Sequence, residues 1–326
     1  MIRLQRILFP TDFSACAEGA FTHAAYLAAH FEAELHVLHA VADESAPARD
    51  WPDASGTGSL QISLADVYED LQIPLPPPPE DHDSHDSVEV IETEVVGRAV
   101  PEVVLGYVDD EDVDLVVMGT HGRRGLRRML MGSVAAEVVR LAPCPVFTVG
   151  GREAGERGWA IRRIVAPVDF SDHSVLAARH AAALVQAYDA DLTLFHVVDA
   201  ATVPTGGTPT LGPVRVSANE VQTRSQKTLE RLAADLRAEF PAVGDVRAFV
   251  GVGRPASDIV DFAEEHDADL VVVGSHGRTG MKRLLMGSVA EQVVRSAPCP
   301  VFTVKSFGRT LLPTARSEDV EPAAEA

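Results

Sequence analysis

The sequence predicts an α/β protein made of two tandem doubly wound domains, each with a five-stranded parallel sheet of the Rossmann type. Short aliphatic runs alternate with helix-like segments, and this arrangement occurs twice, at a spacing of about 155 residues. Each copy also places a glycine-rich stretch directly after an aliphatic run. Aliphatic strands separated by helices imply a parallel sheet that is covered on both faces.

The repeat has the length of a whole domain. Residues 111–149 match residues 266–304 at 28 of 39 positions, and Arg6-Ile-Leu-Phe-Pro-Thr-Asp-Phe-Ser14 corresponds to Arg163-Ile-Val-Ala-Pro-Val-Asp-Phe-Ser171. A repeat of this size indicates domain duplication and not a solenoid. We therefore expect a first domain over 1–150, a linker at 151–159, a second domain over 160–305 and a disordered acidic tail at 306–326.

The second unit shows the expected elements most clearly. Its helices are expected to start at capping residues, and Ser171 or Asp172 is a suitable N-cap for the first of them. Strands are expected at 161–168, 191–198, 245–250, 269–273 and 301–304, and helices at 171–187, 218–239, 256–266 and 288–296.

The first unit departs from this pattern at about 43–87. This segment has one short helical stretch, 63–71, followed by Ile-Pro-Leu-Pro-Pro-Pro-Pro, through which a helix cannot continue. The polar, proline-rich residues 74–86 are expected to form a mobile loop, and their histidines and aspartates are not expected to bind a metal. The second helix of this unit is therefore predicted to be shortened.

Composition excludes several classes of partner. The formal net charge of −20 repels phosphate backbones and anionic lipid, so neither nucleic acid nor a membrane is expected to bind. No apolar run reaches the roughly 20 residues of a membrane helix, and the N-terminus lacks the pattern of a secretory signal. We expect a cytoplasmic protein. Cys144 and Cys299 lie at matching places in the two units and are expected to be buried structural thiols.

The glycine-rich stretches carry the functional prediction. Both copies follow the pattern G-x2-G-x9-G-S and lie between a predicted strand and a predicted helix. Glycines have no side chain, so they let the main chain approach a ligand closely. A glycine-rich loop followed by a helix start is therefore an arrangement that can bind a nucleotide. Each residue also has a simpler interpretation: Asp12 and Asp169 could cap the first helix, and Ser133 and Ser288 could be ordinary N-caps. The occurrence of the whole set in both units favours the nucleotide site.

Together these residues resemble the universal stress protein family in its tandem two-domain form. The resemblance rests on both glycine patterns, on Pro-Thr-Asp12 and Pro-Val-Asp169 after the first strands, and on the two Pro-Cys-Pro-Val segments. It covers about residues 2–149 and 160–305. It implies a Rossmann-like fold of the adenine nucleotide alpha hydrolase type, a role in stress tolerance, and ATP binding by members that have this loop.

The resemblance also implies roles for individual residues. Asp12 would lie near the ribose or adenosine, and the main chain of Ala40 would meet the adenine edge. Gly122 would let the loop approach phosphate, and Gly132 with Ser133 would hold the phosphates at a helix start. The full set expected in the first site is Pro10, Thr11, Asp12, Ala40, Met118, Gly119, His121, Gly122, Gly132, Ser133 and Val134. The set expected in the second site is Pro167, Val168, Asp169, Val197, Val273, Gly274, His276, Gly277, Gly287, Ser288 and Val289.

Other side chains near these motifs have weaker signals. His39 and His196, at strand ends, are expected to be packed structural histidines, whereas His121 and His276 either line the mouth of the pocket or are solvated. The arginines inside both loops can offset the charge of a triphosphate. Magnesium or manganese can bridge the phosphates, although no carboxylate cage for a metal is evident.

The leading functional hypothesis is a nucleotide-binding stress or regulatory module that binds ATP in each domain. One alternative is a slow ATPase or phosphotransferase. The chain has no Walker motif and no evident general base beside Ser133 or Ser288, so no catalytic residue is assigned and an enzyme is the less favoured hypothesis. The other alternative is a scaffold with two empty sites.

Duplication also predicts how the two domains pack. They are expected to form a pseudo-twofold pair, the intramolecular counterpart of an isologous dimer. The resemblance implies that the last strands, 146–149 and 301–304, meet across that axis, and it allows a further homodimer. Because the shortened helix would leave the first site more open, the second site is expected to bind more tightly.

Overall fold

The computed structural model describes residues 2–43, 45, 59–63, 87–120, 131–150, 160–201, 218–277, 286–305 and 307–312. The predicted loop at 74–86, the linker at 151–159 and residues 64–71 of the predicted short helix lie outside these residues. So do the arginine-containing parts of the two glycine-rich loops, 121–130 and 278–285.

The first unit contains the predicted alternation of strands and helices. Its five parallel strands are β1 (Arg6–Pro10), β2 (Glu34–Ala42), β4 (Ser87–Gly97), β5 (Leu115–Gly119) and β6 (Val146–Val149). Its helices are α1 (Ala15–Phe31), α3 (Val100–Asp110) and α4 (Ser133–Leu141). They follow the apolar spacing of the sequence, and their buried residues lie on the sides that face the sheet.

The second unit repeats this plan. Its parallel strands are β7 (Arg163–Pro167), β8 (Asp191–Asp199), β9 (Val246–Gly253), β10 (Leu270–Gly274) and β11 (Val301–Val304). Its helices are α5 (Asp172–Tyr188), α6 (Ala218–Glu239), α7 (Pro255–Glu265) and α8 (Ser288–Ser296). The predicted fold class is therefore confirmed, with element bounds that differ from the predicted ones by up to three residues.

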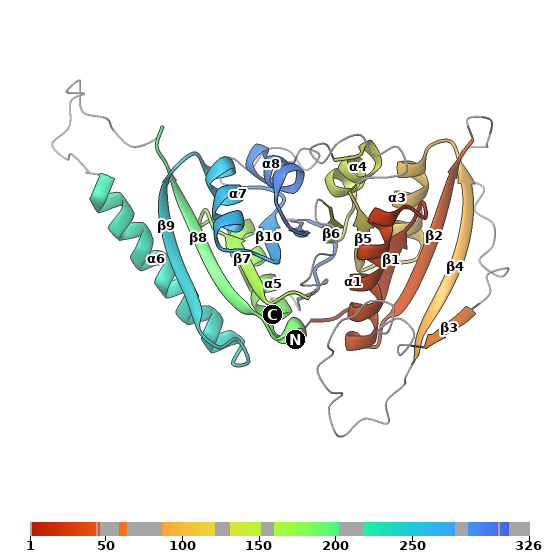
Figure 1. The fold of residues 1–326 in the computed structure, drawn as a ribbon, viewed down its shortest axis with the longest axis horizontal. Coiled ribbons are helices and arrows are strands. Elements are labelled where there is room, and N and C mark those ends of the chain that lie inside the picture. The colour runs from red at the N-terminus through yellow and green to blue at the C-terminus, as the bar shows by residue number, and fades with distance from the viewer. Residues whose placement is uncertain are drawn as a thin grey trace, which may run out of the picture.

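The two units join into one sheet through their last strands. β6 pairs antiparallel with β11, with Phe147 opposite Phe302. In the part of the chain that the structure describes, the sheet has 11 strands in the order β3-β4-β2-β1-β5-β6-β11-β10-β7-β8-β9. Figure 1 shows the two units side by side, with β3 and α6 at opposite outer ends. The prediction that the last strands meet is confirmed, and each of these edges is covered by the other.

The segment between β2 and β4 corrects one prediction. Before the predicted short helix, of which 64–71 lie outside the described residues, it contains a strand, β3 (Ser59–Ser63), which pairs antiparallel with the first half of β4. Ser63 is the last residue of this strand and not the first residue of a helix. The five residues Ser-Leu-Gln-Ile-Ser alternate polar and apolar, which is a strand pattern. The described residues of the first unit therefore form six strands, five of them parallel.

Helices cover both faces of the sheet. One continuous apolar core lies between the sheet and α1, α5 and α6, and a second lies between the sheet and α3, α4, α7 and α8. Both cores extend through both units. Cys144 and Cys299 are buried free thiols, as expected, and burial raises the pKa of the Cys144 thiol to about 12.

The residues after β11 differ from the expected loose tail. Leu311 and Leu312 are buried, and the Leu311 carbonyl accepts a hydrogen bond from the Arg3 amide at 2.7 Å. Arg309 of this segment donates to the carbonyls of Val108 and Val113 in the first unit. Residues 307–312 therefore tie the end of the second unit back onto the first. The rest of the predicted tail, 313–326, lies outside the described residues.

Candidate functional site

Each unit has a switch point at which ligands of doubly wound sheets bind. In the second unit β7 lies between β8 and β10, and the strand order reverses there. The carboxyl ends of neighbouring parallel strands lie at one edge of the sheet, so the segments that follow them converge. Pro167 ends β7, Val168 and Asp169 follow it, and Val273 and Gly274 end β10. β1 and β5 form the equivalent point in the first unit.

The structure brings the predicted glycines of the second site next to its aspartate. A Cβ on Gly277 would lie 2.6 Å from Asp169 Oδ2, so no other residue fits there without moving that carboxylate. The Gly287 amide donates to the Ser275 carbonyl at 2.8 Å, which holds the start of α8 against the loop. A Cβ on Gly274 would lie 2.9 Å from the His173 carbonyl. Three glycines and one carboxylate therefore meet within one small region.

The start of α8 has the geometry of an anion site. The first hydrogen bond of the helix runs from the Glu291 amide to the Gly287 carbonyl at 2.9 Å. The amides of Ser288, Val289 and Ala290 therefore have no acceptor within the helix, and together with the helix dipole they favour a negative group. The N-cap is Gly287, so the alternative interpretation of Ser288 as an N-cap is wrong.

Asp169 is fixed by the start of α5. Its Oδ1 accepts hydrogen bonds from the Ser171 amide at 3.0 Å and from the Ser171 hydroxyl at 2.5 Å. Its own amide donates to Ser174 Oγ at 3.2 Å. The N-cap of α5 is Ser171, whose side chain accepts from the Ser174 amide, so the aspartate holds the capping residue and is not itself the cap.

The first site has the same main-chain plan. The Ser14 amide donates to Asp12 Oδ1 at 3.1 Å, and the Gly132 amide donates to the Thr120 carbonyl at 2.7 Å. Gly132 is the N-cap of α4, so Ser133 is not, and the amides of Ser133 and Val134 precede the first intrahelical bond. Met118 and Gly119 end β5. His121 and Gly122 lie outside the described residues.

The first two strands of each unit, β1 with β2 and β7 with β8, stop pairing beside the switch point. The last backbone bond there runs from the Thr11 amide to the Leu38 carbonyl in the first unit and from the Val168 amide to the Phe195 carbonyl in the second. β2 continues to Ala42 and β8 to Asp199. Because alternate peptide groups of a strand face the same neighbour, those of Ala40 and Val197 face the space beyond β1 and β7.

Two histidines close these strand ends. His39 Nδ1 lies 3.0 Å from the Thr11 carbonyl oxygen, and His196 Nδ1 lies 2.6 Å from the Val168 carbonyl oxygen. His196 is buried and His39 is half-buried. The predicted packing of these side chains is confirmed, but their contact with the segment that carries the aspartate was not predicted.

Sequence reasoning also missed two aromatic residues. Phe13 and Phe170 follow the aspartates and have φ values of 58° and 64°, a region that bulky residues rarely adopt. Their rings lie against His39 and His196, with centroid distances of 4.9 Å and 4.4 Å. The repeated Asp-Phe-Ser of the sequence was the only available signal. Strain of this kind in both units indicates a functional constraint.

His276 is buried and not solvated. Its Nδ1 lies 3.0 Å from Ser275 Oγ, and its Cα would lie 3.7 Å from a Cβ on Gly287. It therefore belongs to the packing of the loop start against α8.

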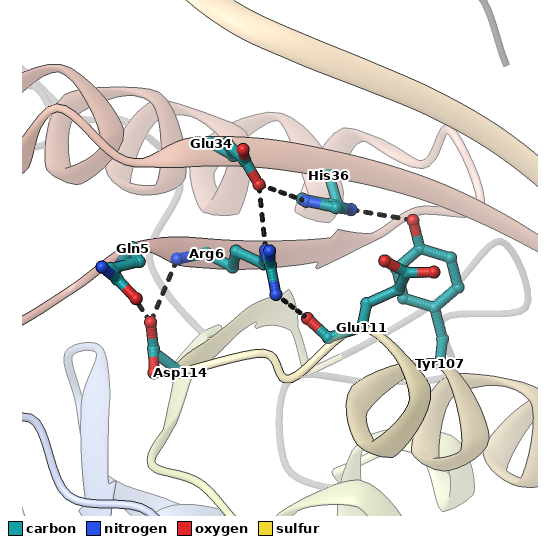
Figure 2. Close-up of polar contacts among 7 residues, drawn as sticks. All are labelled: Gln5, Arg6, Glu34, His36, Tyr107, Glu111 and Asp114. Atoms are coloured by element: carbon teal, nitrogen blue, oxygen red, sulfur yellow. Dashed lines mark hydrogen bonds and ion pairs between the residues drawn. The ribbon is translucent and has the colours of Figure 1, made fainter. Parts of the chain in front are cut away.

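A second polar cluster lies at the other end of the first unit's sheet (Figure 2). His36 Nδ1 lies 2.8 Å from the Tyr107 hydroxyl, and Arg6 Nε donates to Glu34 at 3.0 Å. Burial lowers the pKa of His36. Arg6, Glu34 and His36 lie in the amino-terminal parts of β1 and β2, so the cluster is not part of the candidate site.

Two further chemistries find no support in the part of the chain that the structure describes. It contains no group of three or more histidine, cysteine or acidic side chains placed to hold a metal ion. Within the same residues, no helix combines the length and apolar character needed to cross a bilayer.

The fold and the two sites define a class: a duplicated, doubly wound α/β protein with a glycine-rich loop and a helix start at each switch point. The model of the universal stress protein family matches residues 3–150 and 160–305, and the chain belongs to that family. The match covers most of both units.

Individual relatives agree with this assignment. A universal stress protein of Methanocaldococcus jannaschii is 38% identical over 144 residues, which are 44% of this chain and 82% of the relative. One of Mycobacterium tuberculosis is 29% identical over 255 residues, which are 72% of this chain and 82% of the relative. A putative universal stress protein from Pseudomonas aeruginosa is similar in fold over 93% of both chains, with a TM-score of 0.60 and 17% identity.

Proposed function

We propose that this protein binds ATP at each of the two switch points and acts as a nucleotide-dependent stress-response module. The observation that carries the proposal is the meeting of Asp169, Gly277 and the start of α8 at one place. Main-chain amides of a helix start can bind phosphates, and glycines permit close approach of the backbone. The first unit repeats the described part of this arrangement.

The peptide groups of Ala40 and Val197 supply the proposed contact for the base. Each offers one donor and one acceptor beyond the end of a neighbouring strand. Adenine presents a matching acceptor at N1 and a donor at N6. The arginines predicted to offset the phosphate charge lie outside the described residues. Magnesium or manganese would accompany the phosphates.

Binding would act as a switch because the ligand favours the loop conformation that contacts it. The experiment is to denature freshly purified protein, identify the released small molecule by mass spectrometry and measure its amount per chain. Adenine nucleotide near two equivalents is expected, and the ratio of ATP to ADP reports on turnover. If no nucleotide is released and none binds on addition of ATP, the chain is a scaffold with empty sites and the proposal is wrong.

A further inference from the structure

His39 of β2 and His196 of β8 lie beside the ends of β1 and β7 and occupy a position that a backbone amide would otherwise take. In parallel pairing, the carbonyl of Thr11 would accept the amide of Ala40 at the next step after the bond from Thr11 to Leu38. No such backbone bond is found among the described residues, and His39 Nδ1 contacts the Thr11 carbonyl oxygen instead. His196 makes the same contact with the Val168 carbonyl in the second unit. The imidazole therefore ends the strand pairing in both units.

The contact of each imidazole with a carbonyl also affects the next peptide group, that of Ala40 or Val197. A carbonyl oxygen only accepts, so Nδ1 carries the hydrogen in both contacts. The amide of Ala40 or Val197 makes no backbone bond to that carbonyl among the described residues and is directed at the space beyond the strand. The histidine also holds the segment that carries the aspartate at a fixed distance from that amide.

The phenylalanines fix the histidines in turn. Phe170 packs its ring on His196 at 4.4 Å between centroids while its backbone has a positive φ, and Phe13 does the same with His39. Phe13 keeps this conformation although 68% of it is exposed, so burial of the ring alone does not explain it. The pair of rings recurs with the same interplanar angle of 41° in both units.

We propose that His39 and His196 are positioning residues that set the preference for adenine over other bases. The inference rests on the proposed function, because it assumes that the base meets the peptide groups of Ala40 and Val197. Guanine presents a donor at N1 and an acceptor at O6, the reverse of adenine. A rigid donor and acceptor pair therefore discriminates between the two bases, whereas a mobile pair discriminates less.

The test measures the dissociation constants of ATP, GTP and inorganic tripolyphosphate in the second site alone. The first site is disabled with Gly132→Asp, and His196→Leu removes the contact in that background. Loss of one hydrogen bond predicts about tenfold weaker ATP binding and a similar fall in the ratio of ATP to GTP affinity. Tripolyphosphate affinity is expected to be unchanged, because the helix start is untouched.

His196→Asn is the rescue variant. Its Nδ2 can occupy the place of Nδ1 and donate to the Val168 carbonyl, so it should retain most of the base preference. His39→Leu tests the same contact in the first site with Gly287→Asp as background. His36→Leu in that background is the matched control, because His36 lies at the other end of the same strand (Figure 2).

The outcomes separate the two claims. If the unmodified chain binds no adenine nucleotide, the proposed function fails. If it binds ATP but His196→Leu keeps the ratio of ATP to GTP affinity, the role of the histidine is overturned while the proposed function stands. An equal loss of ATP and tripolyphosphate binding, or an equal loss in His196→Leu and His196→Asn, would also overturn it, since either would indicate a general structural role.

Discussion

The two candidate sites share a main-chain plan but differ in the side chains that follow their aspartates. In the second site the hydroxyl of Ser171 donates to Asp169, and Ser174 accepts from the Asp169 amide. In the first site Ala17 stands where Ser174 stands and has no hydroxyl. The Ser14 hydroxyl is buried and has no hydrogen-bond partner among the described residues.

The comparison shows which part of the duplicated unit has been retained and which has diverged. Both units retain the glycines at the helix starts, the aspartates and the histidine contacts. The side chains that fix the aspartate have diverged. Because a ligand binds more tightly to groups that are already ordered, we expect the second site to have the higher affinity.

The largest expected effect is the loss of one bound nucleotide on substitution of a helix-start glycine. Gly287→Asp places a carboxylate where the phosphates would bind, and Gly132→Asp does the same in the first site. Repulsion and loss of charged hydrogen bonds predict at least about tenfold weaker binding at the altered site. Titration calorimetry should show one equivalent in place of two.

Gly287→Ala is the matched control for that prediction. Its Cβ would lie 3.5 Å from the Ser275 carbonyl oxygen, an ordinary contact, so the fold should be unaffected. A smaller loss of affinity than in Gly287→Asp is expected. If Gly287→Asp still binds two equivalents of ATP with the affinities of the unmodified chain, this helix start is not a phosphate site.

Acid should lower the stability of the interface between the units through one buried histidine in each unit, His23 and His180. Burial lowers the pKa of His23 and of His180 to about 4, and both rings lie beside the Phe147 and Phe302 pair of β6 and β11. The unfolded chain therefore binds more protons than the folded one between about pH 6.5 and 4. The free energy of unfolding should fall as pH falls through this window, by on the order of 3 kcal/mol for each histidine.

Urea unfolding at pH 7 and pH 4.5 checks this prediction. His180→Leu and His23→Leu should each reduce the loss by a similar amount, since the residues occupy equivalent places. An unchanged pH dependence in both variants would contradict the assignment of the acid sensitivity to this interface.

Ser174 should account for part of the higher ATP affinity of the second site. Ser174→Ala, measured with the first site disabled, should weaken ATP binding by about three- to tenfold, because one hydrogen bond to the aspartate segment is lost. Ala17→Ser, measured with the second site disabled, should act in the opposite direction. Equal affinities of the two sites in the unmodified chain would contradict the comparison itself.

The smallest effect is expected away from the sites, in the cluster of Figure 2. The second unit has Thr193 and Phe262 where the first has His36 and Tyr107. Tyr107→Phe should reduce the free energy of unfolding by about 1 kcal/mol, because Nδ1 of buried His36 loses its hydrogen-bond partner. Adding His36→Thr should recover part of this loss. Nucleotide affinity should not change in either variant.

Much of the architecture could be predicted because the same sequence pattern occurs in both units. The aliphatic strands and the glycine patterns recur in both units, and the resemblance to the universal stress protein family implied the pairing of the last strands. β3 was missed because its five residues lie in a segment dominated by proline and charge, and a strand of that length depends on the partner it pairs with.

The details of the site were harder to predict. The aspartates and glycines were found from their pattern, and the structure brings Asp169 and Gly277 together. The contact of His39 with Thr11 depends on where one strand ends beside another, which sequence spacing does not specify. The positive φ of Phe13 was unpredictable for a related reason, since intrinsic preference opposes it and only the surrounding structure imposes it.

The most direct test of the central claim is a calorimetric titration of nucleotide-free protein with ATP. The account predicts two equivalents per chain with unequal affinities. Gly132→Asp should leave the tighter event and Gly287→Asp the weaker one. Absence of saturable ATP binding in the unmodified chain would contradict the account, and a single event that survives both substitutions would place the site elsewhere.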